Sequence, residues 1–365
     1  MIHYDVVIFG AGLAGLSAAN YLLKERNRIL LIDPQSSPLG TDFPGGLVNP
    51  ATGKRATPGW RGQTCYKKLR SHIETLSNLN NGPPLYMDSG VLRPALTEKL
   101  AENFAKTLQV HDWPDGWLQW IDADQIARDY PYIAPSHGGL QIQAGYTVYV
   151  DRYLSTYRNW LKERGACLLR GHAIYETQTS PQASFAIRTD NESLCTSDRV
   201  VVAAGVNSVR FLGWETLNIH PVKGQMVLYD SPQVLPWNCA VSAKGYSLRI
   251  GQKQLLAGST YEHHFDNLDT TDEAFERVTS YLKQTFPHRA GTLNRAAQFC
   301  GVRVTTPNRL PVIGEHPDRE RLFIYTGMNS KGLLFSEYTG QLLAQHITRG
   351  EPIPEELAVG RLLPD

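Results

Sequence analysis

The chain has 365 residues, of which 42% are hydrophobic, and its 36 lysines and arginines nearly balance its 35 aspartates and glutamates. This length suits two domains, or one large nucleotide-binding domain from which a second part has grown. A formal net charge of +1 favours neither a nucleic-acid-binding stripe nor a polybasic membrane patch.

Targeting and metal signals are also missing from the sequence. The N-terminus "MIHYDVVIFG" enters a strand directly without a signal peptide, and no apolar run is long enough to cross a bilayer. The five cysteines are scattered and form no CxxC pair, so we expect reduced thiols and no metal site. These features together predict a cytoplasmic protein without a membrane span.

The most specific segment is "YDVVIFGAGLAGLSAANYLLKERNRILLID" near the N-terminus. The continuous β-type run Asp5–Phe9 is typical of a strand buried on both faces of a parallel sheet. A glycine-rich turn follows, then a helical pattern over Leu16–Leu23, then a second buried strand ending at Asp33. Strand, turn, helix, strand and acid thus occur in the order of a dinucleotide-binding unit.

Each residue of this turn has a physical role. Gly10 permits the tight turn, Gly12 lets the backbone approach a pyrophosphate, and Gly15 allows close packing of helix on strand. Asp33, 18 residues beyond Gly15, is placed to bind ribose hydroxyls. We expect the cofactor to contact Gly10, Gly12, Leu13, Ala14, Gly15 and Asp33. The motif does not choose between NAD and FAD, and a structural turn in another α/β protein is the alternative.

The middle of the chain combines segments that alternate strand and helix with segments that do not. A helix is expected over about Asp151–Arg164, and a buried strand over Val200–Val202 ends in the small residues Ala204 and Gly205, either beside a nucleotide or in an ordinary tight turn. Residues 60–140 are rich in Trp, Pro and Tyr. Residues 220–300 show short antiparallel strands and a helix from about Thr271 to Phe286, which would form the floor of a second pocket.

These patterns predict an α/β fold of two parts. One part is a Rossmann-like domain with a parallel sheet, and the other is an inserted substrate domain built on an antiparallel sheet. We assign residues 1–60, 141–220 and 301–365 to the discontinuous cofactor domain, and residues 61–140 and 221–300 to the substrate domain.

The stretch "CGVRVTTPNRLPVIGEH" begins as an alternating strand with Arg303 at its centre. A guanidinium that faces inward needs a partner, which is either a fixed carboxylate of the protein or a group that arrives with a substrate. A further strand (Leu322–Tyr325), a loop (Gly327–Gly332) and a helix (Leu333–Ile347) follow, and they place a second helix N-terminus near Lys331. A plain terminal unit with an exposed lysine is the alternative.

Five segments in series resemble the D-amino-acid oxidase and glycine oxidase family of flavoproteins. They are "FGAGLAGLSAANYLL…LLID", "VVVAAGVNS", "PVKGQM", "YSLRIGQKQLLAGSTYEH" and "GVRVTTPNRLPVIG" with "GMNSKGLL". The resemblance implies an FAD-dependent oxidoreductase that oxidises the CH–NH bond of an amino acid or secondary amine. The hydride passes to flavin N5, the product imine hydrolyses in water, and no general base is required.

The same resemblance implies roles for individual residues. Arg303 binds the substrate carboxylate with a planar fork of N–H donors, Tyr246 is a candidate to share that carboxylate, and Lys331 with its helix N-terminus stabilises negative charge on the flavin. Tyr246 is equally well explained as a packed strand aromatic. We expect FAD to contact, in addition, Gly45, Gly46, Asn49, Ala204, Gly205, Gly327, Asn329, Ser330, Lys331, Gly332 and Leu333.

Two departures from the family pattern stand out. Lys54 and Arg55 follow the loop expected to wrap the flavin, where they could bind a second acidic group or face solvent. Sarcosine oxidases attach their flavin through a cysteine of the C-terminal strand. The matching position here is Gly301, with Cys300 on the opposite face of the strand, so we expect FAD to be bound non-covalently.

The sequence also resembles the flavin-containing C-terminal half of the bifunctional tRNA wobble-uridine modification enzyme, notably in "GSTYEH". The alternative function is therefore removal of a carboxymethyl group from a wobble-uridine amine, with the same arginine. A near-neutral chain argues against a nucleic-acid partner, although a local patch remains possible from Lys54, Arg55, Arg61, Lys67, Lys68 and Arg70. A scaffold with a degenerate flavin site is disfavoured by the intact glycines and Arg303. The identity of the amine, the choice of oxygen or another electron acceptor, and the oligomeric state stay open.

Overall fold

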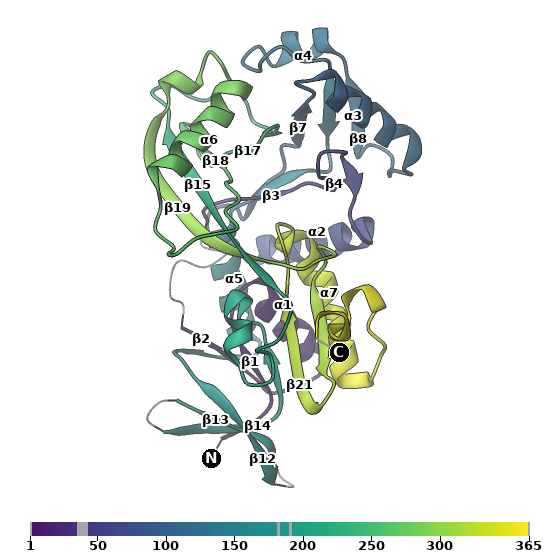
Figure 1. Ribbon diagram of the computed structural model, residues 1–365, viewed down its shortest axis with the longest axis vertical. Coiled ribbons are helices and arrows are strands. Elements are labelled where there is room, and N and C mark those ends of the chain that lie inside the picture. The colour runs from purple at the N-terminus through teal and green to yellow at the C-terminus, as the bar shows by residue number, and fades with distance from the viewer. Residues whose placement is uncertain (1, 35–42, 181–182, 190–191, 364–365) are drawn as a thin grey trace.

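The computed structural model describes residues 2–34, 43–180, 183–189 and 192–363. Two parts are stacked along the long axis of the molecule (Figure 1). One part is built around β1, β14 and β21 and carries both ends of the chain, and the other is built around β15, β18 and α6. None of the helices in this described portion combines the length and the apolar character that a bilayer span requires.

A mixed sheet with a parallel centre forms the first part. Its strands run β11-β2-β1-β14, and β21 lies parallel to β14 on the other side, while β13, β12 and β20 extend it with antiparallel pairs. The bounds are β1 Ile2–Phe9, β2 Ile29–Asp33, β11 Cys167–Arg170, β12 Ile174–Ser180, β13 Ala183–Arg188, β14 Ser193–Val202, β20 Val312–His316 and β21 Arg319–Thr326.

The register brings the carboxyl ends of the parallel strands together. Phe9 at the end of β1 pairs with Ile32 on one side and with Val202 on the other, and Val202 pairs in turn with Ile324. Ligands of open α/β sheets bind at this edge. The strand centre is apolar on both faces, because residues of alternating parity along β1 pack into two different cores.

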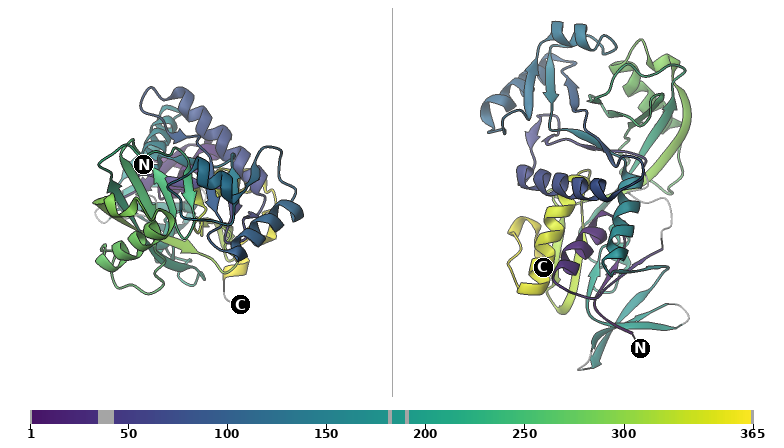
Figure 2. Two further views of the ribbon diagram at one scale, coloured as in Figure 1. Left: turned by 90° about the horizontal axis from the view of Figure 1, so that it is seen from above. Right: turned by 180° about the vertical axis from the view of Figure 1, so that it is seen from behind.

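Three helices lie on one face of this sheet, and a fourth, α2, packs across two of them (Figures 1 and 2). They are α1 Leu13–Lys24, α2 Gly62–Leu79, α5 Val150–Glu163 and α7 Gly332–Arg349. Helices α1 and α7 pack so closely that a Cβ on Gly340 would lie 1.9 Å from Ser17 Oγ. Helix α2 packs on α7 and α5 with an apolar stripe that includes Leu69 and Ile73, although the sequence had placed residues 61–140 in the second part.

An eight-stranded, largely antiparallel sheet forms the second part, in the order β19-β15-β18-β17-β16-β7-β9-β8. The strands are β7 Val91–Pro94, β8 Leu118–Ile121, β9 Gly139–Ile142, β15 His220–Asp230, β16 Ala240–Ser242, β17 Tyr246–Arg249, β18 Gln254–Gly258 and β19 Asn294–Thr305. Helix α6 (Asp272–Thr285) packs on β15 and β18, and α3 (Glu98–Val110) packs near β8 and β9. The predicted combination of a parallel and an antiparallel sheet is confirmed.

Short elements complete the chain. A small sheet joins β3 Gly46–Val48, β10 Tyr146–Val148 and β6 Tyr86–Met87, and a ribbon joins β4 Ala51–Thr52 to β5 Thr57–Pro58. The remaining helical turns are α4 Ala123–Asp129, η1 Gly205–Arg210, η2 Ala290–Thr292, η3 Glu355–Leu357 and η4 Val359–Leu362. Strands β15 and β19 are the longest of the second sheet, and they reach down toward the first part (Figure 1).

One buried carboxylate, Glu337 of α7, lies where the four helices meet. Its Oε1 accepts hydrogen bonds from Tyr157 Oη at 3.0 Å and Tyr153 Oη at 3.4 Å, and Asn20 Nδ2 donates to Oε2 at 3.4 Å. His72 Nε2 lies 3.8 Å from Oε1. Burial raises the pKa of Glu337 to about 7 despite these donors, and burial lowers the pKa of His72 to about 3.

We predict that this carboxyl group makes stability fall as pH rises. The folded state holds the proton of Glu337 more tightly than the unfolded chain, so the stabilisation is complete below about pH 4.5 and is lost as pH rises to about 7. A shift of this size corresponds to roughly 3 kcal/mol. Glu337→Gln should remove this fall, so its melting temperature relative to that of wild type should rise between about pH 4.5 and 7, whereas Glu320→Gln, at an exposed position of β21, serves as the control. Parallel curves for wild type and Glu337→Gln would contradict the prediction.

Candidate functional site

A cavity of about 1430 Å³ lies between the two sheets. The first part contributes the carboxyl ends of β1, β2, β14 and β21, and the second contributes residues of β15, β17 and β19. The cavity therefore joins the edge at which parallel sheets bind cofactors to the face of the antiparallel sheet. All the site residues expected from sequence line it except Gly15.

In the turn from β1 into α1, each of the three glycines is required for a different structural reason. Gly10 has φ +106°, and a Cβ there would lie 2.3 Å from the carbonyl oxygen of Ala203. A Cβ on Gly15 would lie 1.8 Å from the carbonyl oxygen of Gly10, so Gly15 allows packing of the turn and does not face the cavity. A Cβ on Gly12 meets no described atom within 4 Å. Gly12 is therefore the glycine whose missing side chain leaves space in the cavity itself.

Helix α1 begins at this turn, and no side chain of its N-cap residue bonds to its first backbone N–H groups. This residue is Gly12, and the cavity also touches Leu13 and Ala14. Uncapped N–H groups and the positive end of the helix dipole favour a phosphate group. The geometry therefore fits the pyrophosphate of a dinucleotide.

Asp33, at the end of β2, lines the cavity and also holds the turn together. Its Oδ2 accepts a hydrogen bond from the backbone N–H of Ala11 at 2.5 Å, and the residue is only 7% exposed. The carboxylate thus fastens the glycine turn to the neighbouring strand. A contact of the same group with ribose hydroxyls remains a prediction.

A second uncapped helix, α7, begins on the other side of the cavity. Its N-cap, Lys331, makes no side-chain cap, and the loop before it is tied to β19 because Asn329 N–H donates to Val304 O at 2.9 Å. Asn329 has φ +53°, and its amide Nδ2 donates to Gly327 O at 2.6 Å. The cavity touches every residue from Gly327 to Leu333. Burial, with a smaller effect of Arg309, lowers the pKa of Lys331.

Small residues of two chain segments complete this side of the cavity. The cavity is lined by Gly45, Gly46, Asn49, Ala204 and Gly205. A Cβ on Gly46 would lie 2.7 Å from a side-chain carbon of α7, and Gly205 has φ +58°. These glycines let the loops approach the cavity and one another closely.

Arg303 reaches the cavity from the centre of β19, as the alternation of the strand predicts. Val302 and Val304 on its two sides are buried, Arg303 is half-buried, and all three line the cavity. Its Nη1 donates to Thr260 O at 3.3 Å and its Nη2 to Ser259 Oγ. Within the described ranges no carboxylate forms an ion pair with it. The sequence left two possible partners for this guanidinium, a fixed carboxylate of the protein or a group of the substrate, and the described residues supply no such fixed carboxylate.

Two tyrosines flank this guanidinium. Tyr246 of β17 lines the cavity and its hydroxyl donates to Met226 Sδ at 3.3 Å, and burial raises its pKa to about 12. The ring of Tyr261 lies with its centroid 4.6 Å from Arg303 Cζ, although this residue was not selected from sequence. Its segment "GSTYEH" attracted attention only as a family likeness, because an exposed aromatic in a loop carries no periodic signal.

Other positions singled out from sequence lie away from the cavity. Lys54 and Arg55 are exposed and do not line it. Cys300 is a buried free thiol that does not line the cavity, whereas its neighbour Gly301 does.

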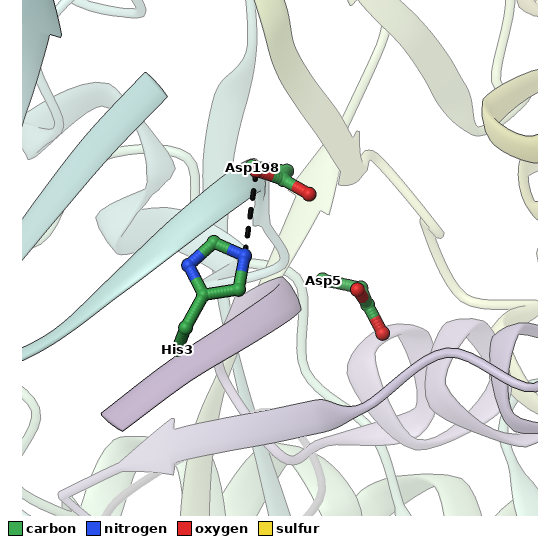
Figure 3. A group of neighbouring side chains, drawn as sticks. All are labelled: His3, Asp5 and Asp198. Atoms are coloured by element: carbon green, nitrogen blue, oxygen red, sulfur yellow. Dashed lines mark ion pairs between the residues drawn. The ribbon is translucent and has the colours of Figure 1, made fainter. Parts of the chain in front are cut away.

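One group of possible metal ligands occurs within the described residues. It comprises His3, Asp5 and Asp198 (Figure 3). His3 Nε2 lies 3.4 Å from Asp198 Oδ1, and Asp5 Oδ2 accepts the backbone N–H of Arg28. The group lies toward the amino end of β1, whereas the cavity lies at the carboxyl end, and His3 and Asp198 are about one-third exposed. It is accounted for as a surface ion pair.

The cavity as a whole fits an elongated dinucleotide. It extends from the α1 turn and Asp33, past the loop before α7, to the guanidinium of Arg303. Two uncapped helix N-termini and the open space at Gly12 suit a bound FAD with its phosphates at α1. The guanidinium of Arg303 then lies on the opposite side, next to the second sheet.

Comparison with known proteins agrees with this geometry. The chain is 23% identical over 368 residues to glycine oxidase of Geobacillus kaustophilus, covering 95% of this chain and 94% of the relative. It is 28% identical to a glycine oxidase of Pseudomonas aeruginosa, with coverage of 95% and 96%. The tRNA 5-methylaminomethyl-2-thiouridine biosynthesis bifunctional protein MnmC of Thiobacillus denitrificans is 23% identical over 98% of this chain, which spans 58% of that longer protein.

The crystal structure of the G. kaustophilus glycine oxidase shares the fold, with a TM-score of 0.85 and 21% identity over the full length of both chains. A family model described as FAD dependent oxidoreductase, DAO, matches residues 5–346. Because this match spans most of the sequence, the chain belongs to the DAO family of FAD-dependent oxidoreductases.

Proposed function

We propose that this protein oxidises the CH–NH bond of a small amino acid or secondary amine, and that Arg303 holds the carboxylate of the substrate. The observation that carries the proposal is the guanidinium on the cavity wall that has no acidic partner in the described part of the chain. A half-buried cation of this kind is costly unless an anion reaches it. The relatives named glycine oxidase support a substrate of this class.

Arg303 and its neighbours bind and orient the substrate. A carboxylate accepts two parallel hydrogen bonds from a guanidinium, which fixes the adjacent α-carbon in one orientation. Tyr246 keeps its proton, because burial raises its pKa to about 12, so it can donate but not act as a base. Its present acceptor, Met226 Sδ, is a weak one, so the hydroxyl loses little by donating to a carboxylate.

The cofactor side holds FAD through the α1 turn and the loop before α7. When bound, FAD supplies the two-electron acceptor that takes a hydride from the substrate α-carbon while the nitrogen lone pair forms the C=N bond. The N-terminus of α7 and Lys331 place positive potential at this side of the cavity. Water then hydrolyses the imine, and we assign no general base.

A tRNA nucleoside amine is the second candidate substrate, supported by the similarity to MnmC over 98% of this chain. The cations that would form a tRNA-binding patch are only partly available. Lys54, Arg55 and Lys67 are exposed, whereas Arg70 pairs with Glu74 and Asp88. A tRNA substrate would bind with an affinity that falls steeply as salt rises.

The first measurement is the visible spectrum of the purified protein without oxygen, before and after adding glycine, sarcosine, proline and D-amino acids. We expect a flavin spectrum that bleaches with at least one of these compounds and names the substrate class. A spectrum that no member of the panel bleaches, together with salt-dependent binding of tRNA, would move the proposal to the second candidate.

Arg303→Ala is expected to keep FAD and lose substrate affinity. Removing one partner of a charge-assisted pair costs roughly 2–5 kcal/mol, which corresponds to a fall in kcat/KM of about 30-fold to several thousand-fold. Arg295→Ala is the matched control, because Arg295 lies on the same strand and pairs at the surface with Asp272. Wild-type kinetics in Arg303→Ala would remove this residue from the site.

Gly12→Val is expected to fold but to lose FAD. The backbone of Gly12 has φ −83°, which valine can adopt, and the added carbons would extend into the cavity beside the α1 turn. The melting temperature of the apoprotein should be near that of wild-type apoprotein, while the flavin content after purification should be close to zero. Gly15→Val should instead destabilise the fold, since its Cβ would collide with the backbone of Gly10. A yellow, fully loaded Gly12→Val would count against the cofactor assignment.

A further inference from the structure

The Arg303 side chain lies across the backbone of the neighbouring strand β15. Arg303 pairs with Val222 of β15, and Gly224, two residues further along on the same face, is paired with Gly301. The guanidinium extends over Gly224, where any larger residue would present a side chain. The glycine of the "PVKGQM" segment therefore has a spatial role that sequence did not assign.

The distances show how closely the two residues fit. An ideal Cβ on Gly224 would lie 2.2 Å from Arg303 Nη1, 2.6 Å from Nη2 and 2.7 Å from Cζ. Because both terminal nitrogens would lie nearer to this Cβ than Cζ does, the Nη edge of the guanidinium points toward the glycine. A methyl group there would force the guanidinium to move by about 1 Å or more to reach van der Waals contact.

The same two terminal nitrogens donate hydrogen bonds to the segment after β18. Ser259 Oγ and Thr260 O accept these two hydrogen bonds, and both residues are buried. Gln225 of β15 holds this segment, because Thr260 N–H donates to Gln225 O at 3.1 Å and Gln225 N–H donates to Thr260 Oγ1 at 2.9 Å. The acceptors are thus fixed relative to the strand that carries Gly224.

Side chains on the opposite face of the sheet also hold the segment that contains Ser259 and Thr260. Glu262 Oε1 accepts hydrogen bonds from Thr260 Oγ1 at 2.5 Å and from Gln225 Nε2 at 3.0 Å, and its Oε2 lies 3.8 Å from Lys223 Nζ. Lys223 and Gln225 alternate with Gly224 along β15, so they lie on the face away from Arg303. The nearby carboxylate is committed to this network, which leaves the guanidinium for a ligand.

We infer that Gly224, Ser259 and Thr260 form a cradle for the Arg303 guanidinium, and that Gly224 is a positioning residue for the substrate carboxylate. This inference rests on the proposed carboxylate-binding role of Arg303. Gly224 acts through its missing side chain, which leaves room beside β15 for the Nη edge of the guanidinium. A residue at this position with any side chain displaces the fork and weakens carboxylate binding without touching the substrate.

The test is Gly224→Ala in the FAD-loaded protein, titrated with acetate as a simple carboxylate and assayed with the amine that bleaches the flavin. We expect the Kd of acetate and the KM of the amine to rise by about tenfold to a hundredfold, the equivalent of losing one charge-assisted hydrogen bond. The value of kcat should fall less, and flavin content and melting temperature should stay as in wild type, because the end of a flexible side chain can give way.

Two controls make the result specific. Gly291→Ala, at a position where a Cβ meets no described atom within 4 Å, should bind acetate as wild type does. The double variant Gly224→Ala/Arg303→Ala should bind acetate no more weakly than Arg303→Ala alone, because the methyl group acts only through the guanidinium. Equal losses from Gly224→Ala in both backgrounds, or an unchanged Kd in the single variant, would overturn the cradle.

Ser259→Ala tests the other edge of the cradle and decides the matter if Gly224→Ala does not fold. It adds no atom and removes one acceptor of the guanidinium, so acetate should bind several-fold more weakly, again only when Arg303 is present. An unchanged Kd would overturn the inference. If Arg303→Ala itself binds acetate as wild type does, the proposed function fails instead, so the two failures are distinguishable.

Discussion

The close approach of three backbone segments at the end of β1 is the constraint on which the rest of this structure depends. The carbonyl oxygen of Ala203 lies where a Cβ on Gly10 would stand, and the carbonyl oxygen of Gly10 lies where a Cβ on Gly15 would stand. Only glycine permits both contacts. They bring β1, β14 and the start of α1 together, so that the helix N-terminus and the carboxyl ends of the strands face one cavity.

The second sheet places the guanidinium of Arg303 on the opposite side of the cavity from the α1 turn. Its antiparallel strands carry two basic residues close in space but separated by the sheet. Lys223 is paired with Glu262 on one face, and Arg303 lies on the other without an acid among the described residues. Alternation along β15 and β19 produces this separation. The fold thereby keeps a protein carboxylate away from the position that a substrate carboxylate is proposed to occupy.

The helix layer contains an ionisable group that, unlike Arg303, is fully enclosed by the protein and has fixed hydrogen-bond donors. The carboxyl group of Glu337 lies at the centre of four helices, where side chains of α1 and α5 donate hydrogen bonds to it. Because desolvation dominates over these donors, its pKa rises to about 7. The polar cluster links α1, which follows Gly12, to α7, which follows Lys331.

The sequence by itself determined the parts of the site that depend on local chemistry. The glycine turn, Asp33, the small residues after β14 and the arginine within an alternating strand were all readable, because turn geometry and strand periodicity act over a few residues. Tertiary structure alone decided the rest. Tyr261, Ser259 and Thr260 meet Arg303 across about 40 residues of chain, and Gly224 lies beneath it from another strand. Helix α2 belongs to the first part for the same reason, since its apolar stripe predicts a buried face but does not say which distant segments that face packs against.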